Sequence, residues 1–184
     1  GDMNEHLPEP LIYSAWMRAL QDRLIRDEIG PLADTFLHVE PLFIERVYRD
    51  IEGASKWCDI VQSSSVETCR DMAELALNDA IIMLKETFGG SIEALRWGDA
   101  HQATHLHMAL GHVPLLKYVV NIYQSTSGGD HTLQRGRSKG SGKDSFQNIH
   151  AAGYRGIYDF ADPDSSLFVI ATGQSGHPLS RHYD

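Results

Sequence analysis

The sequence predicts an α+β fold in which a helical N-terminal half is followed by β-strands. Apolar residues recur at helical spacing through most of residues 1–99, whereas short apolar runs separated by turn residues dominate residues 100–184. The charge changes at the same place: residues 1–99 hold 9 basic and 19 acidic side chains, and residues 100–184 hold 7 and 6. We therefore expect a mainly helical portion over 1–99 and a loop and strand portion over 100–184.

The first expected helix lies between the prolines at 8 and 10 and the Gly30–Pro31 pair. Proline is tolerated in the first turn of a helix because its missing N–H would have no intrahelical partner there, and glycine favours a helix end. Apolar residues repeat every four positions in between, so they share one face. This face consists of Ile12, Trp16, Leu20 and Leu24.

A second helix is expected to begin at Pro41 and to end at Gly53. Its apolar face consists of Phe43, Ile44, Val47, Tyr48 and Ile51.

A third helix is expected between Ser64 and the Gly89–Gly90 pair. Ser64 and Glu67 have the spacing of a capping box, in which each side chain bonds the backbone N–H of the other. The apolar face consists of Ala73, Leu77, Ala80, Ile81, Leu84 and Phe88. Ser91 is expected to cap a short fourth turn that ends at Leu95.

Residues 154–160 and 166–172 are predicted to form a β-hairpin. Both are rich in aromatic and β-branched residues, and Asp162, Pro163 and Asp164 between them favour a turn. Residues 167–171 are apolar without interruption, which is typical of a strand covered on both faces. We therefore expect this strand to have neighbours outside the chain.

Composition excludes several classes of protein. Because 16 basic residues stand against 25 acidic ones, the net charge of −9 argues against a nucleic-acid partner. The longest apolar runs fall far short of the roughly 20 residues that cross a bilayer, so no membrane contact is expected. Cys58 and Cys69 lack the spacing of a metal knuckle, and the sequence leaves open whether they are free or paired.

Four histidines are clustered shortly after Trp97 and form a candidate metal site. They are His101, His105, His107 and His112. The first two would share a face if the segment were helical, but no carboxylate or cysteine stands at a matching offset, and two glycines disfavour a regular helix. We favour hydrogen-bonded structural histidines and keep a metal site as the alternative.

Ser175 is a candidate nucleophile because an expected strand precedes it and glycines flank it. A nucleophile elbow needs glycine two residues after the serine, where this chain has His177, and Pro178 prevents the helix that would follow. A tight glycine turn is the better interpretation.

Residues 135–143 carry four basic side chains, and five of the nine residues are Gly or Ser. The segment lacks the spacing of a phosphate-binding P-loop, and no periodic helix follows it. We predict a solvated, mobile loop.

Three motifs in the second half resemble the C-terminal end of the penicillin amidase family. They are Gly-Gly-Asp-His-Thr-Leu at 128–133, Ser-Phe-Gln-Asn-Ile at 145–149, and the closing segment 162–184 with its Gly-Gln-Ser-Gly and His-Tyr-Asp groups. Residues 8–12 and 97–102 are similar to weaker landmarks of the same region. The resemblance thus spans almost the whole chain but only part of a family protein.

This resemblance implies an N-terminal nucleophile hydrolase. In that family a precursor cuts itself, the freed N-terminal serine of the β chain attacks an amide, and its own α-amino group is the base. The family fold is a four-layer αββα sandwich, to which both portions of this chain would contribute as parts of one larger hydrolase domain.

No position of this chain matches the family's nucleophile, the residue that assists it, or its oxyanion-hole asparagine. We therefore assign no catalytic, cofactor-binding or metal-binding residue, and expect no cofactor in this stretch. Because the first residue is Gly1 and family chains continue past the His-Tyr-Asp motif, we expect a piece of a longer protein that is inactive alone.

The sequence is consistent with two alternative functions. The first is the C-terminal part of the β chain of a periplasmic or secreted acylase that cleaves a linear amide, such as the side-chain amide of a β-lactam or an acyl-homoserine lactone. Its partners would be the rest of the β chain, the α chain and a small acyl amide substrate. The alternative is a self-contained helical binding module that uses the histidine cluster for a metal or its acidic helices for a basic partner.

Overall fold

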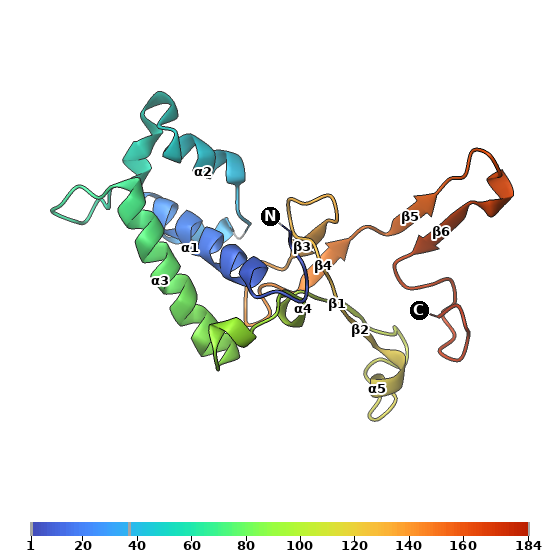
Figure 1. Ribbon diagram of the computed structural model, residues 1–184. Coiled ribbons are helices and arrows are strands. Elements are labelled where there is room, and N and C mark those ends of the chain that lie inside the picture. Colours follow the sequence, from blue (N-terminus) through green and yellow to red (C-terminus); the bar gives the residue numbers. More distant parts are fainter. Residues whose placement is uncertain (1, 37, 184) are drawn as a thin grey trace. The chain divides into compact units, whose positions relative to one another are not determined.

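The computed structural model describes residues 2–36 and 38–183, which form two compact units. The helical unit comprises Leu7–Arg96 with Gly140–Lys143, and the sheet unit comprises the other described residues. The three long helices precede the strands along the chain, and two short helices accompany the strands (Figure 1), so the predicted α+β class is confirmed.

The helical unit contains the three predicted helices and short 3₁₀ turns between them (Figure 1). These elements are α1 (Glu9–Ile29), η1 (Gly30–Thr35), α2 (Pro41–Tyr48), η2 (Ile51–Cys58), α3 (Cys69–Phe88) and η3 (Ile92–Ala94). Ser91 precedes η3 as expected, although its side chain makes no cap hydrogen bond there.

Helix α1 lies between the predicted limits, but Ile12 and Trp16 are only partly buried, and Leu11 and Ala15 complete its buried face instead. One polar side chain on that face has a structural role. Gln21 is only 4% exposed, and its amide nitrogen donates to the carbonyl of His38 at 2.8 Å. Its amide oxygen accepts the backbone N–H of Glu40 at 2.6 Å. Because the amide satisfies backbone groups of the connection to α2, Gln21 ties that connection to α1.

The predicted end of the second helix is wrong. Helix α2 ends at Tyr48, and Asp50 adopts a left-handed conformation with φ of 50°. The Asp50 carboxylate accepts the N–H of Ser55, which favours the turn over a further helical turn. Gly53 therefore lies at a kink inside η2 rather than at the end of α2.

The predicted start of the third helix is also wrong. The capping box is formed by Thr68 and Asp71, whose side chains bond each other's backbone N–H groups. Glu67 instead accepts the N–H of Ile60 and the hydroxyl of Ser65, so it stabilises the preceding loop. Both residue pairs have capping-box spacing, and the loop contacts decide which pair caps the helix.

The buried face of α3 is rotated from the predicted one. Ala80 and Leu84 are buried as expected, but Met72 and Ala76 complete the face in place of Ala73 and Leu77, and Phe88 is 37% exposed. The reason is the contact with α1: the indole N–H of Trp16 donates to the Ala73 carbonyl at 2.9 Å. This contact fixes which side of α3 meets α1.

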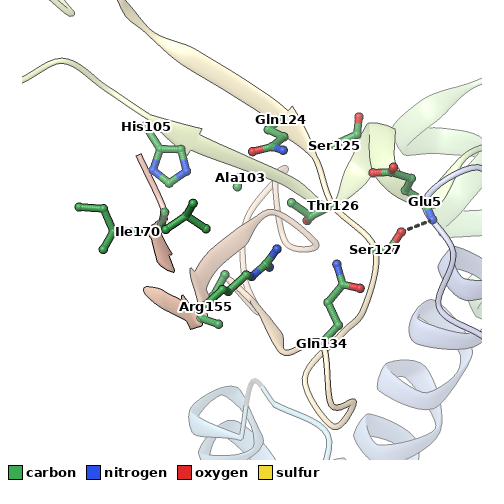
Figure 2. A pocket seen from close by; sticks show the side chains of 14 residues that line it. Glu5, Ala103, His105, Gln124, Ser125, Thr126, Ser127, Gln134, Arg155 and Ile170 are labelled. Atoms are coloured by element: carbon green, nitrogen blue, oxygen red, sulfur yellow. Dashed lines mark hydrogen bonds between the residues drawn. The ribbon is translucent and has the colours of Figure 1, made fainter. Parts of the chain in front are cut away.

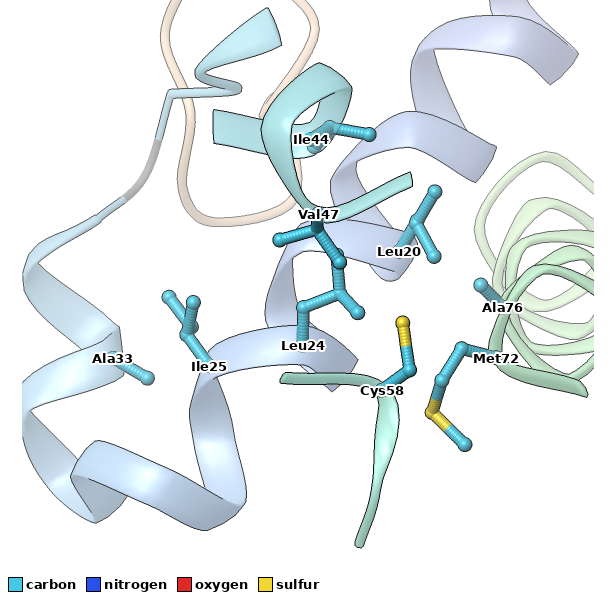
Figure 3. Close-up of a cluster of buried hydrophobic side chains, with 9 residues drawn as sticks. All are labelled: Leu20, Leu24, Ile25, Ala33, Ile44, Val47, Cys58, Met72 and Ala76. Atoms are coloured by element: carbon cyan, nitrogen blue, oxygen red, sulfur yellow. The ribbon is translucent and has the colours of Figure 1, made fainter. Parts of the chain in front are cut away.

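The helical unit has one apolar core, which Figure 3 shows. It consists of Leu20, Leu24, Ile25, Ala33, Ile44, Val47, Cys58, Met72 and Ala76. Cys58 and Cys69 form a disulfide that joins the end of η2 to the start of α3, which settles the alternative that the sequence left open.

The sheet unit contains a mixed four-stranded sheet with the order β2-β1-β4-β3. Strand β1 pairs with β2 antiparallel and with β4 parallel, and β3 pairs with β4 antiparallel. The elements are α4 (Trp97–Ala100), β1 (Gln102–His105), α5 (Lys117–Val120), β2 (Ile122–Ser125), β3 (Gly136–Ser138) and β4 (Asn148–Ala151).

The predicted hairpin is confirmed as a separate two-stranded sheet of β5 (Tyr154–Ile157) and β6 (Leu167–Ile170), with a 3₁₀ turn at Pro163–Ser165 between them. Figure 1 shows the two strands side by side. The four side chains of β6 are between 43% and 68% exposed. The cover expected on both faces of β6 is therefore not provided by the described residues of this chain.

None of the described helices has the length and hydropathy that a membrane span requires.

Candidate functional site

The four clustered histidines do not converge. His101 is fully buried at the end of α4, His105 lies on β1, and His107 belongs to the turn after it. Within residues 2–36 and 38–183, no group of three or more His, Cys, Asp or Glu side chains is arranged to hold a metal ion. The helix that would have put His101 and His105 on one face ends at Ala100, so their shared spacing brings no ligands together.

His101 is the most buried of the four histidines. Its ring stacks on the indole of Trp97, with centroids 4.3 Å apart and planes 14° from parallel. Its Nδ1 lies 2.7 Å from the carbonyl oxygen of Phe146. Burial lowers the pKa of the imidazole below its usual 6.5, whereas the hydrogen bond to the Phe146 carbonyl and, after it, the negative charge of Asp130 act in the opposite direction.

His107 anchors the closing segment of the chain. Its Nδ1 accepts the backbone N–H groups of Ala109 and Leu110, so its Nε2 carries the proton and donates to the carbonyl of Gly176 at 3.2 Å. The phenol of Tyr183 donates to the Val120 carbonyl. The contacts of His107 fit its interpretation as a hydrogen-bonded structural group.

Ser175 lies in a tight turn, as its sequence context indicated. Its backbone N–H donates to the carbonyl of His182 at 2.9 Å, and its hydroxyl oxygen accepts the N–H of His177 at 3.1 Å. Gly173 has φ of 63°, and a Cβ there would lie 2.4 Å from the His182 carbonyl oxygen. The glycine is thus required by the turn, and residues 176–183 contain no helix that could form a nucleophile elbow.

The prediction of a mobile loop over residues 135–143 is wrong for its first part. Residues Gly136–Ser138 form β3, paired with β4, and Ser138 is only 2% exposed. The N–H of Ser138 donates to the carboxylate of Asp130 at 3.1 Å. Tertiary pairing overrides a local composition that favours a loop, because the basic side chain of Arg137 points to solvent while its neighbours are buried.

A buried polar junction connects residues 97–101, 126–128 and Asn148, and sequence reasoning did not place these side chains together. The Trp97 indole N–H donates to the Gly128 carbonyl at 2.7 Å. The Thr126 hydroxyl donates to the His101 carbonyl at 2.6 Å and accepts from the amide of Asn148 at 3.1 Å. Trp97, Gly128 and Asn148 each lie in a segment that resembles the family, but their spacing along the chain does not show that they meet.

A cavity of about 260 Å³ lies beside this junction, between β1–β2 and the β5–β6 hairpin (Figure 2). Arg155 extends its guanidinium into the cavity, and Gln134 directs its amide end into the same space. His105 and Ile170 also line the cavity. The backbone N–H of Glu5 donates to the hydroxyl of Ser127 at its rim.

The described lining offers binding groups rather than a catalytic set. Amide hydrolysis by a nucleophile needs an attacking group, a base within hydrogen-bond distance, and donors for the developing oxyanion. Ser127 already accepts the Glu5 N–H, and Thr126 is held between His101 and Asn148. These contacts position the sheet and its turns.

Comparison with known proteins assigns the chain to a family. The profile of the penicillin amidase family matches residues 1–184. An acyl-homoserine lactone acylase of Pseudomonas syringae pv. syringae (strain B728a), QuiP, is 25% identical over 196 residues, which cover 100% of this chain and 23% of that protein. The chain thus spans about a quarter of the length of the curated relative. Since the family profile covers all of its residues, the chain belongs to the penicillin amidase family.

Proposed function

We propose that this chain is the C-terminal part of the β chain of an N-terminal nucleophile acylase that hydrolyses linear amide bonds. The observation that carries the proposal is the family match over residues 1–184. The arrangement of the site supports it, because the described residues supply scaffold contacts while the nucleophile, its base and the oxyanion donors would come from elsewhere in the protein.

The substrate would be a small acyl amide, either the side-chain amide of a β-lactam or an acyl-homoserine lactone. The relative named as an acyl-homoserine lactone acylase favours the second class. At 25% identity, the relative supports the type of bond that is cleaved more strongly than the identity of the acyl group.

The partners would be the rest of the β chain and the α chain. The apolar side chains of the β5–β6 hairpin support this, since Leu167, Phe168 and Val169 are each more than half exposed. A row of exposed apolar side chains on a two-stranded ribbon is unstable in water and is normally covered by further strands or helices. The remainder of the protein would supply that cover.

The compartment would be the periplasm or the extracellular space. The Cys58–Cys69 disulfide supports it, because disulfides form and persist in oxidising compartments.

The alternative of a metal-binding module is disfavoured by the contacts of the histidines. His101 is enclosed and bonded to the Phe146 carbonyl, and both ring nitrogens of His107 are engaged. Zinc titration by calorimetry checks this: we expect no sub-micromolar binding that is lost in the His101→Ala, His105→Ala double variant.

The main experiment compares this chain with the complete self-processed protein. Both are assayed against phenylacetyl amides and long-chain acyl-homoserine lactones. We expect turnover by the complete protein and only background by this chain, because loss of a nucleophile and its base costs several orders of magnitude. Ser175→Ala in the complete protein should leave kcat nearly unchanged.

Two outcomes would contradict the proposal. Turnover by this chain alone that disappears with Ser175→Ala would make Ser175 the catalyst. A complete protein that lacks an N-terminal serine after processing, or cleaves none of these amides, would remove the acylase assignment.

A further inference from the structure

His101 is enclosed by groups from three segments of the sheet unit. Its side chain is 0% exposed, and Trp97 covers one face of the ring. Phe146 meets the indole of Trp97 edge-on, with centroids 6.2 Å apart. Asn148 on β4 and Gly136 on β3 close the remaining side, since a Cβ built on Gly136 would lie 2.4 Å from Nε2 of His101 and 2.8 Å from the Asn148 amide nitrogen.

The hydrogen bonds of this imidazole fix where its proton lies. A carbonyl oxygen can only accept, so Nδ1 carries the hydrogen that is directed at Phe146. Nε2 is then the unprotonated nitrogen. It is buried and has no hydrogen-bond partner among the described residues. The neutral ring fits this enclosure, because its Nδ1–H is hydrogen-bonded and its unprotonated Nε2 lies against Gly136.

If Nε2 were protonated, its N–H would find no hydrogen-bond acceptor in this enclosure. Protonation at Nε2 would direct a charged N–H at Gly136 and at the amide nitrogen of Asn148, and neither offers an acceptor there. Burial of an unpaired charge is strongly unfavourable, so the enclosure must open before the proton is accommodated.

The charged groups around the enclosure do not compensate for that charge. Asp130, in the turn before β3, is the acidic group that favours the imidazolium, and it already accepts the N–H of Ser138. The ionisable side chains on the packed elements are exposed: Asp99 on α4, Arg137 on β3 and His150 on β4. Burial is the larger effect, and it lowers the pKa of His101.

We propose that His101 is an acid-sensitive lock that holds β3, β4 and the turn at 128–130 against the Trp97 segment while the ring is neutral and releases them when Nε2 is protonated. The elements that would move depend on the ring directly. Phe146, which leads into β4, bonds it, Gly136 of β3 lies against it, and its own carbonyl holds Thr126. The inference concerns the fold of the sheet unit and does not depend on the acylase proposal.

The direction of the pH effect follows from linkage. Because the folded pKa is lower than the unfolded value of about 6.5, the unfolded or open form binds the proton more tightly. The contribution of His101 to stability is complete above about pH 6.5 and falls as the pH drops below it. The equilibrium constant for opening then rises by at most about tenfold per pH unit.

The test is hydrogen exchange measured by mass spectrometry on the complete mature protein between pH 7.5 and pH 5. Amide rates are corrected for the pH dependence of intrinsic exchange, and exchange of the imidazole Cε1 hydrogen gives the pKa of each histidine. We expect peptides that cover β3 and β4 to lose protection below pH 6.5, while peptides of α1 and α3 keep theirs. The Cε1 hydrogen of His101 should report a pKa below the usual 6.5 of a histidine.

Two variants make the result specific. His101→Asn keeps a donor at the position of Nδ1 but cannot titrate, so β3 protection should no longer depend on pH. His150→Asn removes an exposed histidine of the same sheet and should behave as the wild type. Should His101→Asn fail to fold, the wild-type titration and the His150→Asn control still decide the question.

The proposal is wrong if β3 and β4 keep full protection while His101 titrates near 6.5, or if the acid sensitivity persists in His101→Asn. A wild type whose β3 protection does not change down to pH 5 also overturns it. None of these results bears on whether the protein is an acylase.

Discussion

The helical unit and the sheet unit are held together by different kinds of contact. Nine buried side chains form one apolar core in the helical unit, and a disulfide joins η2 to α3 beneath it. In the sheet unit, the fully buried side chains gather around Trp97, His101 and Phe146, where hydrogen bonds to carbonyl groups are as prominent as apolar contact. The apolar side chains of β6 remain exposed in the same unit.

This difference shows which part of the chain completes its own packing. The helical unit buries its apolar faces against each other, so its stability should be sensitive to cavities. The sheet unit depends on a small polar junction, and its hairpin leaves apolar surface for further protein to cover. The predictions below test this contrast, beginning with the largest expected effect.

Truncation of a leucine in each unit should show the largest difference in stability between the two units. Leu24 is 0% exposed and Leu167 is 68% exposed. We expect Leu24→Ala to lower the free energy of unfolding by about 2–5 kcal/mol, and Leu167→Ala to change it by less than about 0.5 kcal/mol in the isolated chain. Urea unfolding followed by circular dichroism measures both. Equal losses would mean that the hairpin is packed within this chain, and the contrast would fail.

Removal of the disulfide should affect the helical unit alone. The Cys58–Cys69 bond closes a loop with a sequence separation of 11 residues, for which chain entropy gives about 3 kcal/mol of stabilisation. Cys58→Ser with Cys69→Ser should therefore destabilise α1 and α3 in hydrogen exchange and leave β1–β4 unchanged. Slower exchange at α1 in the double variant, or a loss of protection centred on the sheet, would contradict the assignment.

Gly136→Ala tests the polar junction of the sheet unit. The added Cβ would lie 2.4 Å from Nε2 of His101, and overpacking of this kind costs about 1–3 kcal/mol. Gly153→Ala is the matched control, because a Cβ there meets nothing within 4 Å. Protection of β3 amides reports the effect. The loss of β3 protection should be smaller in the Gly136→Ala, His101→Asn double variant, because the shorter asparagine side chain leaves room for the added methyl group.

Substitution of the α3 cap should show which residue begins the helix. Thr68→Ala removes the capping-box acceptor and should cost about 1 kcal/mol. Ser64→Ala should cost less than about 0.5 kcal/mol, since Ser64 lies outside the cap. Thermal unfolding compares the two variants. A larger effect at Ser64 would restore the helix start that the sequence suggested.

The two units should also respond to acid in different ranges. Hydrogen bonds from Thr68 lower the pKa of Asp71, and those from Ser65 and Ile60 lower the pKa of Glu67. Their contribution to the helical unit is present above about pH 4.5 and lost as the pH falls through the lowered values, whereas that of His101 to the sheet unit fades below about 6.5. Exchange profiles from pH 7 to pH 3.5 should show the sheet unit opening first. Simultaneous opening would indicate one cooperative unit.

Several features of the helical unit could be predicted because the information is local. The proline starts, the glycine end of α1 and the four-residue spacing of apolar side chains all act within one or two turns. Errors arose where two local signals were equivalent. The pairs Ser64 with Glu67 and Thr68 with Asp71 have the same spacing, and contacts of Glu67 with the loop decide between them.

The sequence by itself determined the α+β class, the three helices, the β5–β6 hairpin and the resemblance to the penicillin amidase family. Only the tertiary structure decided that Cys58 and Cys69 are bonded, that Gly136–Ser138 is a strand, and that His101 is enclosed. The physical reason is the distance along the chain over which each interaction acts. Periodicity, caps and turns depend on neighbours a few residues away, whereas strand pairing and the burial of a polar ring depend on groups far along the chain: 45 residues separate His101 from Phe146, which accepts its hydrogen bond.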